Sequence, residues 1–223
     1  MMSRKQKAFF YAVASPLMRL NGAIHKTLRS PQEGVVKIHL GPGQQKYLEG
    51  WTNIDSNTFT GKCDVWANLI DGIPMRDGSV DAIYSHHVIE HLPDLAFHFE
   101  EMFRCLKPGG VFRVGGPNGD MAIQKFAEGD SDWFSDFPDK RASLGGRFEN
   151  FIFCRQEHLT ILTLSHLKEI AQAAGFVDIE QVQPCQQTRH PEAFEEVLRL
   201  EYEDTPATPH TLLIEGVKPP SST

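Results

Sequence analysis

The stretch Val35–Asp55, VVKIHLGPGQQKYLEGWTNID, decides the fold. It contains two apolar runs, VVKIHL and WTNI, of which the first ends in Gly41-Pro42-Gly43 and the second in Asp55. Apolar β-branched residues favour a buried strand, and glycines just past its end allow a sharp turn and a close approach of the backbone to a ligand. An acid at the tip of the next strand is where nucleotide-binding α/β folds hold ribose hydroxyls. We therefore expect a pocket for an adenosine-containing cofactor here.

Three kinds of site compete for this glycine turn. A dinucleotide oxidoreductase would have G-x-G-x-x-G, but position 46 is lysine, and Asp55 follows Gly43 much sooner than the usual interval of about 20 residues. A phosphate-binding P-loop requires G-K-[ST], which does not occur in this turn. A cofactor without a pyrophosphate needs only the close backbone approach and the acid for the ribose. That description fits S-adenosylmethionine.

The composition is typical of one globular domain. The chain has 223 residues, of which 40% are hydrophobic and 23% charged, and its formal net charge is −7. An acidic balance disfavours a general nucleic-acid binder. The four cysteines form no CxxC pair, which favours reduced thiols in the cytoplasm over a disulfide framework.

Residues 1–34 are basic and are expected to form two helical segments broken at Pro16. The apolar part before the proline is too short for a signal peptide, so secretion is not expected. Apolar residues recur at helical spacing in the second half, at Leu17, Leu20, Ile24 and Leu28. One interpretation is a basic amphipathic helix on the inner membrane surface or on a partner. The interpretation that we favour is a helix that caps the domain.

From residue 35 onward, strands alternate with helices, a pattern that predicts a parallel α/β sheet in a domain spanning 35–218, before a tail at 219–223. Residues 117–157 lose this rhythm, so we expect an irregular substrate-side insertion there, such as a lid. Helices are expected at 95–106 and at 162–176, the second with Ser165 as its N-cap. Strands are expected at 35–40, 51–55, 63–72, 80–84, 111–117, 177–184 and 210–218.

The segment His87-Val-Ile-Glu90-His91 matches HxxEH, a spacing found in zinc peptidases. Here the motif opens a helix just past a strand, and no downstream carboxylate stands out as a third ligand. We therefore expect no metal site, and we interpret His91 as a helix-start histidine packed on the sheet. His86 and His87 are expected in the pocket, because ligands bind at the carboxyl ends of parallel strands.

Taken in order, several segments resemble the class I S-adenosylmethionine-dependent methyltransferases, and more narrowly their methyltransferase-11-like branch. The segments are HLGPG, GWTNID, DVWANL, IPMRDGSVDAIYSHHVIEHL, LKPGGVFRVGGPN, SHLKEIAQAAGF and HTLLIEGVK. The likeness covers about residues 35–120 and 155–218. It implies a Rossmann-like, doubly wound α/β fold whose sheet is mostly parallel, with an antiparallel last strand and helices on both faces.

The resemblance also implies a set of residues that contact S-adenosyl-L-methionine. The two glycines would lie beside its methionine part, and the acid after the second strand would accept hydrogen bonds from the ribose. An asparagine side chain and the next backbone N–H would meet the adenine, and a histidine would line the sulfonium end. The turn departs from the family's frequent G-C-G, because Pro42 lacks an N–H. The residues in this order are Gly41, Gly43, Asp55, Asn68, Leu69 and His86.

Methyl transfer from a sulfonium is an in-line displacement, so the protein mainly has to hold the acceptor and the methyl group in line. A weakly acidic hydroxyl would also need a base, for which histidine is suited near neutral pH. His86, His87 and His158 are the catalytic candidates, and Asn118 and Asp120 are further candidates for contacting the acceptor.

The tetrapeptide SHHV stands where enzymes that methylate nucleobases or glutamine have NPPY, so N-methylation of those groups is disfavoured. We expect O-methylation of a small molecule or of a sugar or glycan precursor, the latter by analogy with the family's branch alone. The alternative is a member of the fold that binds the cofactor or a partner without catalysis. The altered GPG loop and the lack of an identifiable base motivate that alternative.

Overall fold

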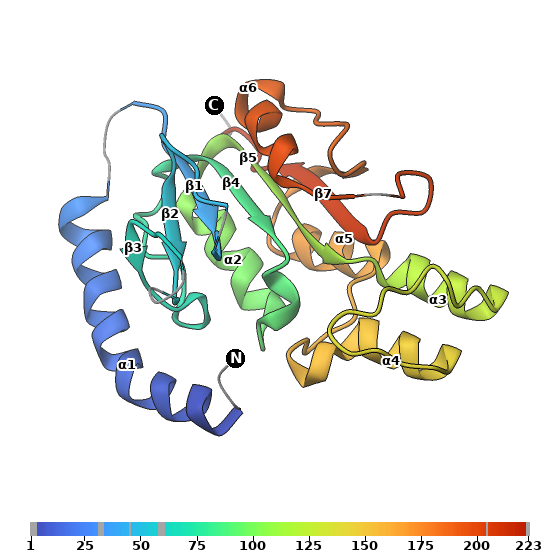
Figure 1. Ribbon diagram of the computed structural model, residues 1–223. Helices are drawn as coiled ribbons and strands as arrows, with labels where there is room; N and C mark the ends of the chain where they lie inside the picture. Colours follow the sequence, from blue (N-terminus) through green and yellow to red (C-terminus); the bar gives the residue numbers. More distant parts are fainter. Residues whose placement is uncertain (1–3, 31–33, 45, 58–60, 204, 222–223) are drawn as a thin grey trace.

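The computed structural model describes residues 4–30, 34–44, 46–57, 61–203 and 205–221. Its centre is a seven-stranded sheet with the strand order β3-β2-β1-β4-β5-β7-β6 (Figure 1). The first five strands in this order, β3, β2, β1, β4 and β5, are parallel to one another. Strand β7 is antiparallel to both of its neighbours, β5 and β6. The predicted mostly parallel sheet with an antiparallel last strand is confirmed.

The strands bring several predicted site residues to one edge of the sheet. Ile38 of β1 pairs with Ile83 of β4, and this parallel pairing aligns the carboxyl ends of the two strands. The strand order reverses between β1 and β4, which is the point where α/β sheets bind ligands. The strand bounds are β1 Lys37–Leu40, β2 Thr52–Asp55, β3 Val65–Trp66, β4 Val80–His86, β5 Leu106–Pro117, β6 Val177–Val182 and β7 Thr211–Val217.

Helices α2 (Leu95–Cys105) and α5 (Leu164–Ala173) bury their apolar faces against one side of the sheet. The ring of Phe112 on β5 packs edge-on against two rings on this side, with centroid distances of 5.9 Å to Phe99 and 4.6 Å to Phe176. Both predicted helices are present. The predicted N-cap at Ser165 is wrong, because the side chain of Thr163 accepts the capping bond from the His166 N–H and Ser165 already lies in the first turn.

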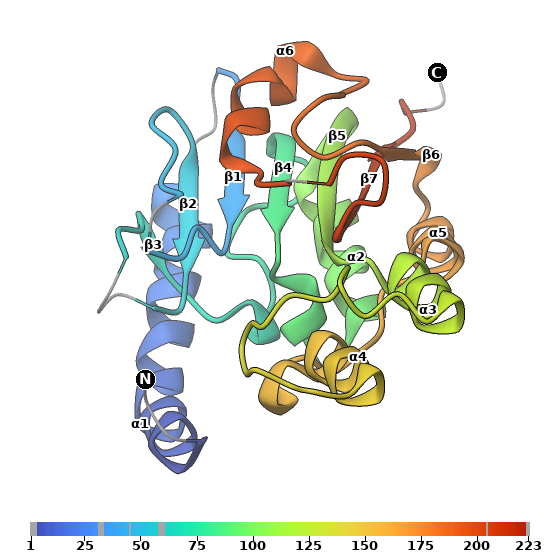
Figure 2. The same ribbon diagram turned by 45° about the vertical axis from the view of Figure 1, so that its right-hand side comes forward.

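The other face of the sheet is covered by the segment between β6 and β7. This segment contains α6 (Pro191–Phe194) and the 3-10 helix η5 (Glu195–Leu200), which lie over β1 and β4 in Figure 2. Phe194 packs there in a cluster with Trp51 and Tyr84. The described residues between β1 and β2 form no helix, so the β6–β7 segment supplies the apolar cover that this face needs.

Helix α1 (Arg4–Ile24) is continuous and leads into the π-helical turn η1 (His25–Arg29). The prediction of a break at Pro16 is wrong, because proline already has a helical φ, and its missing N–H removes one hydrogen bond without ending the helix. The helix lies along the β3 edge of the sheet (Figure 1). The Asn21 amide donates to the Trp66 carbonyl at 3.0 Å, and the Tyr11 hydroxyl lies 3.1 Å from that of Ser56. These contacts are those of a helix that caps the domain.

The segment 117–157 is only partly irregular, because two helices flank the irregular stretch 129–143. It contains α3 (Gly119–Glu128) and α4 (Leu144–Phe153), which pack against each other beyond the carboxyl ends of the strands (Figure 2). Ser143 caps α4 by accepting a hydrogen bond from the Gly146 N–H at 3.1 Å. This segment has a small core of its own, in which the aromatic Trp133 and Phe134 pack with the aliphatic Ala122 and Ile152.

No helix among the described residues is long and apolar enough to cross a bilayer.

Two buried histidines should make the fold sensitive to acid. His39 on β1 and His98 on α2 are each 1% exposed, and burial lowers the pKa of both to about 4. A histidine in the unfolded chain titrates near pH 6.5, so the unfolded state binds more protons between about pH 6.5 and 4. Stability is therefore fully present above pH 6.5 and falls through this window, by about 1 kcal/mol per pH unit for each histidine.

Replacing His98 by glutamine removes one of these groups. Urea unfolding of H98Q at pH 7, 6 and 5 should show a shallower loss of stability than the wild type by about 1 kcal/mol per pH unit. Equal slopes for the two proteins would contradict this assignment.

Candidate functional site

The glycine turn after β1 requires glycine at its first position. Gly41 has φ +67° and Gly43 has φ +59°, both in the left-handed region that favours glycine. A Cβ atom on Gly41 would lie 2.3 Å from Cγ2 of Val88, and the Gly41 N–H donates to the Ile54 carbonyl at 2.9 Å. The turn is thus held closely against β2 and against the segment after β4.

Asp55, the acid at the end of β2, is joined directly to this turn. Its Oδ2 accepts a hydrogen bond from the Gly43 N–H at 2.9 Å, and its Oδ1 accepts one from the Asn57 N–H at 2.8 Å. Each carboxylate oxygen has a second lone pair, so the side chain retains the capacity to accept bonds from a diol. The structure therefore brings three of the predicted cofactor residues together: Gly41, Gly43 and Asp55.

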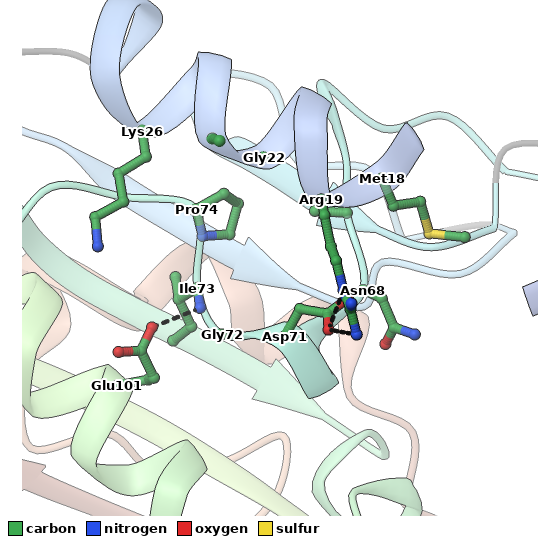
Figure 3. Close-up of a pocket in the computed structure, with 12 residues that line it drawn as sticks. Met18, Arg19, Gly22, Lys26, Asn68, Asp71, Gly72, Ile73, Pro74 and Glu101 are labelled. Carbon is green, nitrogen blue, oxygen red and sulfur yellow. Dashed lines mark hydrogen bonds and ion pairs between the residues drawn. The ribbon is translucent and has the colours of Figure 1, made fainter. Parts of the chain in front are cut away.

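Asn68 and Leu69 follow β3 and begin the 3-10 helix η2 (Leu69–Asp71). The Asn68 side chain caps this helix by accepting from the Ile70 N–H at 3.2 Å, and the Leu69 side chain is buried in the main core. Asn68 also lines a groove of about 300 Å³ between α1 and residues 67–74, where Arg19 pairs with Asp71 at 2.8 Å (Figure 3). The asparagine side chain thus has a structural partner of its own.

His86 and His87 leave β4 in different directions. His86 is buried, and its Nδ1 lies 2.9 Å from the Lys46 ammonium. Burial holds the pKa of His86 well below its usual value, with the neighbouring charges of His87 and Lys46 acting in the same direction, so the ring is neutral at pH 7. His87 has φ +58°, and its Nε2 lies 3.2 Å from the Thr211 hydroxyl.

Glu90, in the 3-10 helix η3 (Ile89–His91), is the residue on which three histidines converge. Its side chain is 1% exposed, and its Oε1 lies 3.4 Å from His87 Nδ1, 3.8 Å from His91 Nε2 and 4.0 Å from His158 Nε2. Burial raises the pKa of Glu90, but the histidines outweigh this effect and hold the pKa below its usual value. A buried carboxylate and three imidazoles therefore form one cluster at the carboxyl end of β4.

The cluster brings together two of the predicted catalytic residues, His87 and His158, which are far apart in the chain. The expectation that His91 packs on the sheet is wrong: its side chain is 42% exposed, and its Nδ1 lies 2.9 Å from the Glu157 carbonyl. Glu90 was missed as a site residue, although the HxxEH spacing was the signal that could have identified it.

A cavity of about 360 Å³ adjoins the cluster. Its walls come from the end of β4, the start of β7, helix α4 and the loops on either side of them. The segment 117–157 contributes seven of the residues that line it. The lining comprises His87, Pro117, Ser135, Phe137, Pro138, Asn150, Phe151, Cys154, His158, Tyr202, Glu203, His210 and Thr211.

Asn118 and Asp120 have structural partners and do not line this cavity. Asn118 is buried, accepts from the Met121 N–H at 3.0 Å to cap α3, and donates to the Pro209 carbonyl at 3.0 Å. Asp120 accepts from the Leu164 N–H at 2.7 Å, at the start of α5. Their prediction as acceptor contacts is wrong, because these polar side chains satisfy helix ends.

Comparison with known proteins agrees with this geometry. Residues 21–114 match the family model described as a methyltransferase domain. Over these residues the chain is similar to that family of methyltransferase domains. It is 52% identical over 57 residues to a Mycolicibacterium smegmatis protein named "Probable S-adenosylmethionine-dependent methyltransferase", a match that covers 26% of this chain and 22% of that relative. The chain thus spans about a fifth of the length of this curated relative.

Solved structures of methyltransferases share the fold of this chain at low sequence identity. A SAM-dependent methyltransferase of Thermotoga maritima superposes with a TM-score of 0.53 and 16% identity, over 96% of each chain. A phosphoethanolamine N-methyltransferase of Haemonchus contortus, solved with S-adenosylhomocysteine, gives 0.52 and 17% over 90% of this chain and 52% of its own. At these identities the likeness concerns the fold alone.

Proposed function

We propose that the protein is an S-adenosylmethionine-dependent methyltransferase that methylates a hydroxyl group of a small molecule or of a sugar or glycan precursor. The observation that carries the proposal is that the glycine turn and the cavity of about 360 Å³ both adjoin the segment just after β4. The turn, which is joined to Asp55, lies against Val88, and the neighbouring His87 lines the cavity. A methyl donor at the turn and an acceptor in the cavity would meet beside His86 and His87.

On the cofactor side, Gly41 and Gly43 would bring backbone close to the methionine part of the cofactor. Asp55 would accept hydrogen bonds from both ribose hydroxyls. The adenine would rest at the end of β3, near the Leu69 N–H and the side-chain nitrogen of Asn68, whose oxygen caps η2. The S-adenosylhomocysteine bound to the Haemonchus contortus structure of the same fold supports this choice of cofactor.

On the acceptor side, His87 and His158 line the cavity, and His87 is the candidate base. The acceptor oxygen would attack the methyl carbon as the carbon–sulfur bond breaks, and His87 would take up the hydroxyl proton. Neutral His86 would line the sulfonium end without repelling its positive charge, because its low pKa keeps it uncharged.

The proposal predicts separate effects on binding and on turnover. Isothermal titration calorimetry should show that S-adenosylhomocysteine binds the wild type, and labelled methyl groups should pass from the cofactor to hydroxylated acceptors in a screen. His87→Asn should lower kcat by about 100-fold or more, since general bases typically contribute at least this much. It should leave cofactor affinity within about threefold, and asparagine tolerates the left-handed backbone of position 87.

Three results would count against this account. Absence of S-adenosylhomocysteine binding would refute the proposed cofactor site. Binding without transfer to any acceptor class would favour the alternative of a non-catalytic member of the fold. Turnover of H87N equal to wild type would remove His87 as the base.

A further inference from the structure

The Glu90 carboxylate is buried without a hydrogen bond to either of its oxygens among the described residues. A buried carboxylate normally accepts several hydrogen bonds, and leaving it unpaired is costly. The nearest ring nitrogens lie 3.4 to 4.0 Å from Oε1, beyond the usual range of about 2.7–3.2 Å for an N–H···O hydrogen bond. The cluster therefore lacks the geometry of direct imidazole–carboxylate hydrogen bonding.

The two histidines farther from the carboxylate have their tautomers set by backbone carbonyls. His91 Nδ1 lies 2.9 Å from the Glu157 carbonyl oxygen, and His158 Nδ1 lies 3.0 Å from that of Ile152. A carbonyl oxygen only accepts, so each Nδ1 carries the hydrogen. In the neutral ring, the Nε2 lone pair then faces Glu90, as in metal-binding histidines that are oriented by outer partners.

The spacing of the three ligand atoms fits one ion between them. One ligand atom each from Glu90, His91 and His158 lie within 4.8 Å of one another. Zinc binds nitrogen and carboxylate oxygen at about 2.0–2.1 Å, which places tetrahedral ligands roughly 3.3 Å apart. The 3.8 and 4.0 Å separations from Oε1 need only a small contraction to reach that value.

The backbone around the cluster is strained where it delivers these side chains. Cys154, Arg155 and Gln156 form η4 and have φ values of 43°, 58° and 65° in the turn that returns His158 to Glu90. Such left-handed conformations are unfavourable for non-glycine residues, and they gather at functional sites. Gly116 is also needed, because a Cβ there would lie 2.7 Å from Glu90 Oε2. The cluster thus depends on an unfavourable backbone conformation at 154–156 and on glycine at position 116.

We propose that Glu90 Oε1, His91 Nε2 and His158 Nε2 bind one divalent transition-metal ion, with zinc as the best match. Two histidines and one glutamate, with one coordination position open, form a ligand set that zinc enzymes use for catalysis. The expectation of no metal, drawn from the sequence, rested on the lack of a downstream carboxylate. The third ligand is instead a downstream histidine, His158.

The role of the ion rests on the proposed function. His158 and His87 both line the acceptor cavity, so the open position of the ion would face an acceptor hydroxyl. The ion would lower the pKa of that hydroxyl, whose proton passes to His87. The oxygen then forms a bond to the methyl carbon, the carbon–sulfur bond breaks, and sulfur leaves with the electron pair as S-adenosylhomocysteine.

The test measures metal binding without cofactor or acceptor, on tag-free protein stripped with a chelator. Zinc content after dialysis, and the visible absorption of Co²⁺ as a probe, should both show one ion per chain. Saturating zinc should raise Tm by about 5 °C or more. His91→Asn and His158→Asn should each weaken Co²⁺ binding by about 100-fold or more. His166→Asn, on α5 and outside the cluster, should bind as the wild type does.

Wild-type protein that binds no stoichiometric zinc or cobalt at 100 µM free ion would overturn the proposal. Metal affinity of H91N equal to that of the wild type would do the same. The melting curve of each variant shows whether it is folded. Calorimetry with S-adenosylhomocysteine separates the two proposals. Metal binding without cofactor binding would refute the proposed function and leave the metal site standing. Cofactor binding without metal binding would refute the metal site alone.

Discussion

Replacing Arg113 by methionine should lower the free energy of unfolding by about 3–5 kcal/mol. Arg113 lies on β5 with a fully buried side chain, and its guanidinium donates to Glu201 at 2.6 and 2.7 Å and to Glu215 at 2.6 Å. Removing it leaves two buried carboxylates without their cation. The Gln187 carbonyl, 2.8 Å away, would also lose its donor. The segment between β6 and β7 should therefore detach from the sheet first.

Urea unfolding measures this effect, and Tm should fall by about 10 °C. Arg19→Ala is the matched control, because it breaks an exposed pair with Asp71 that is worth at most about 1 kcal/mol. The triple variant with R113M, Glu201→Gln and Glu215→Gln should recover much of the loss, since no buried charge remains unpaired. A loss below 1 kcal/mol in R113M would contradict the role given to this ion triad.

Asp55→Ala should weaken S-adenosylhomocysteine binding by about 100-fold. Two hydrogen bonds from the ribose to a carboxylate are together worth about 3 kcal/mol or more, which corresponds to this factor. The substitution also removes the acceptor of the Gly43 N–H, so the glycine turn should lose its anchor on β2. Calorimetry measures the affinity, and the melting curve shows whether the turn alone has loosened.

Two further variants make the Asp55 result specific. Asp55→Asn retains one acceptor oxygen and should lose about tenfold in affinity. Asp71 lies in the groove between α1 and residues 67–74. Asp71→Ala should bind S-adenosylhomocysteine with an affinity within about twofold of that of the wild type. Wild-type affinity in D55A, or a larger loss in D71A than in D55A, would place the cofactor elsewhere.

The sheet could be predicted because its strands carry local signals. β1 and β2 end in residues that turn the chain, and the stripe of α2 repeats at helical spacing up to the glycines that follow it. The helices of 117–157 escaped prediction, because their apolar faces pack mainly on each other and glycines interrupt the pattern. The predicted break at Pro16 was wrong because the fixed φ of proline suits a helix, and tertiary contacts hold this helix against the domain.

The cofactor turn and the acceptor side differ in how far sequence could predict them. Gly41, Gly43 and Asp55 come together through neighbouring parallel strands, a relation that strand order alone predicts. The approach of His158 to Glu90 depends on a left-handed turn at 154–156 that no sequence rule anticipates. Asn118 and Asp120 resembled site residues, because polar residues that cap helices also gather at the ends of strands.

A crystal structure of the protein with S-adenosylhomocysteine tests the central claim most directly. We predict that the ribose hydroxyls lie within hydrogen-bond distance of the Asp55 carboxylate and that the sulfur lies beside the turn at Gly41 and Gly43, facing His87. Ligand bound in the groove between α1 and residues 67–74, or no bound ligand at saturating concentration, would contradict the account.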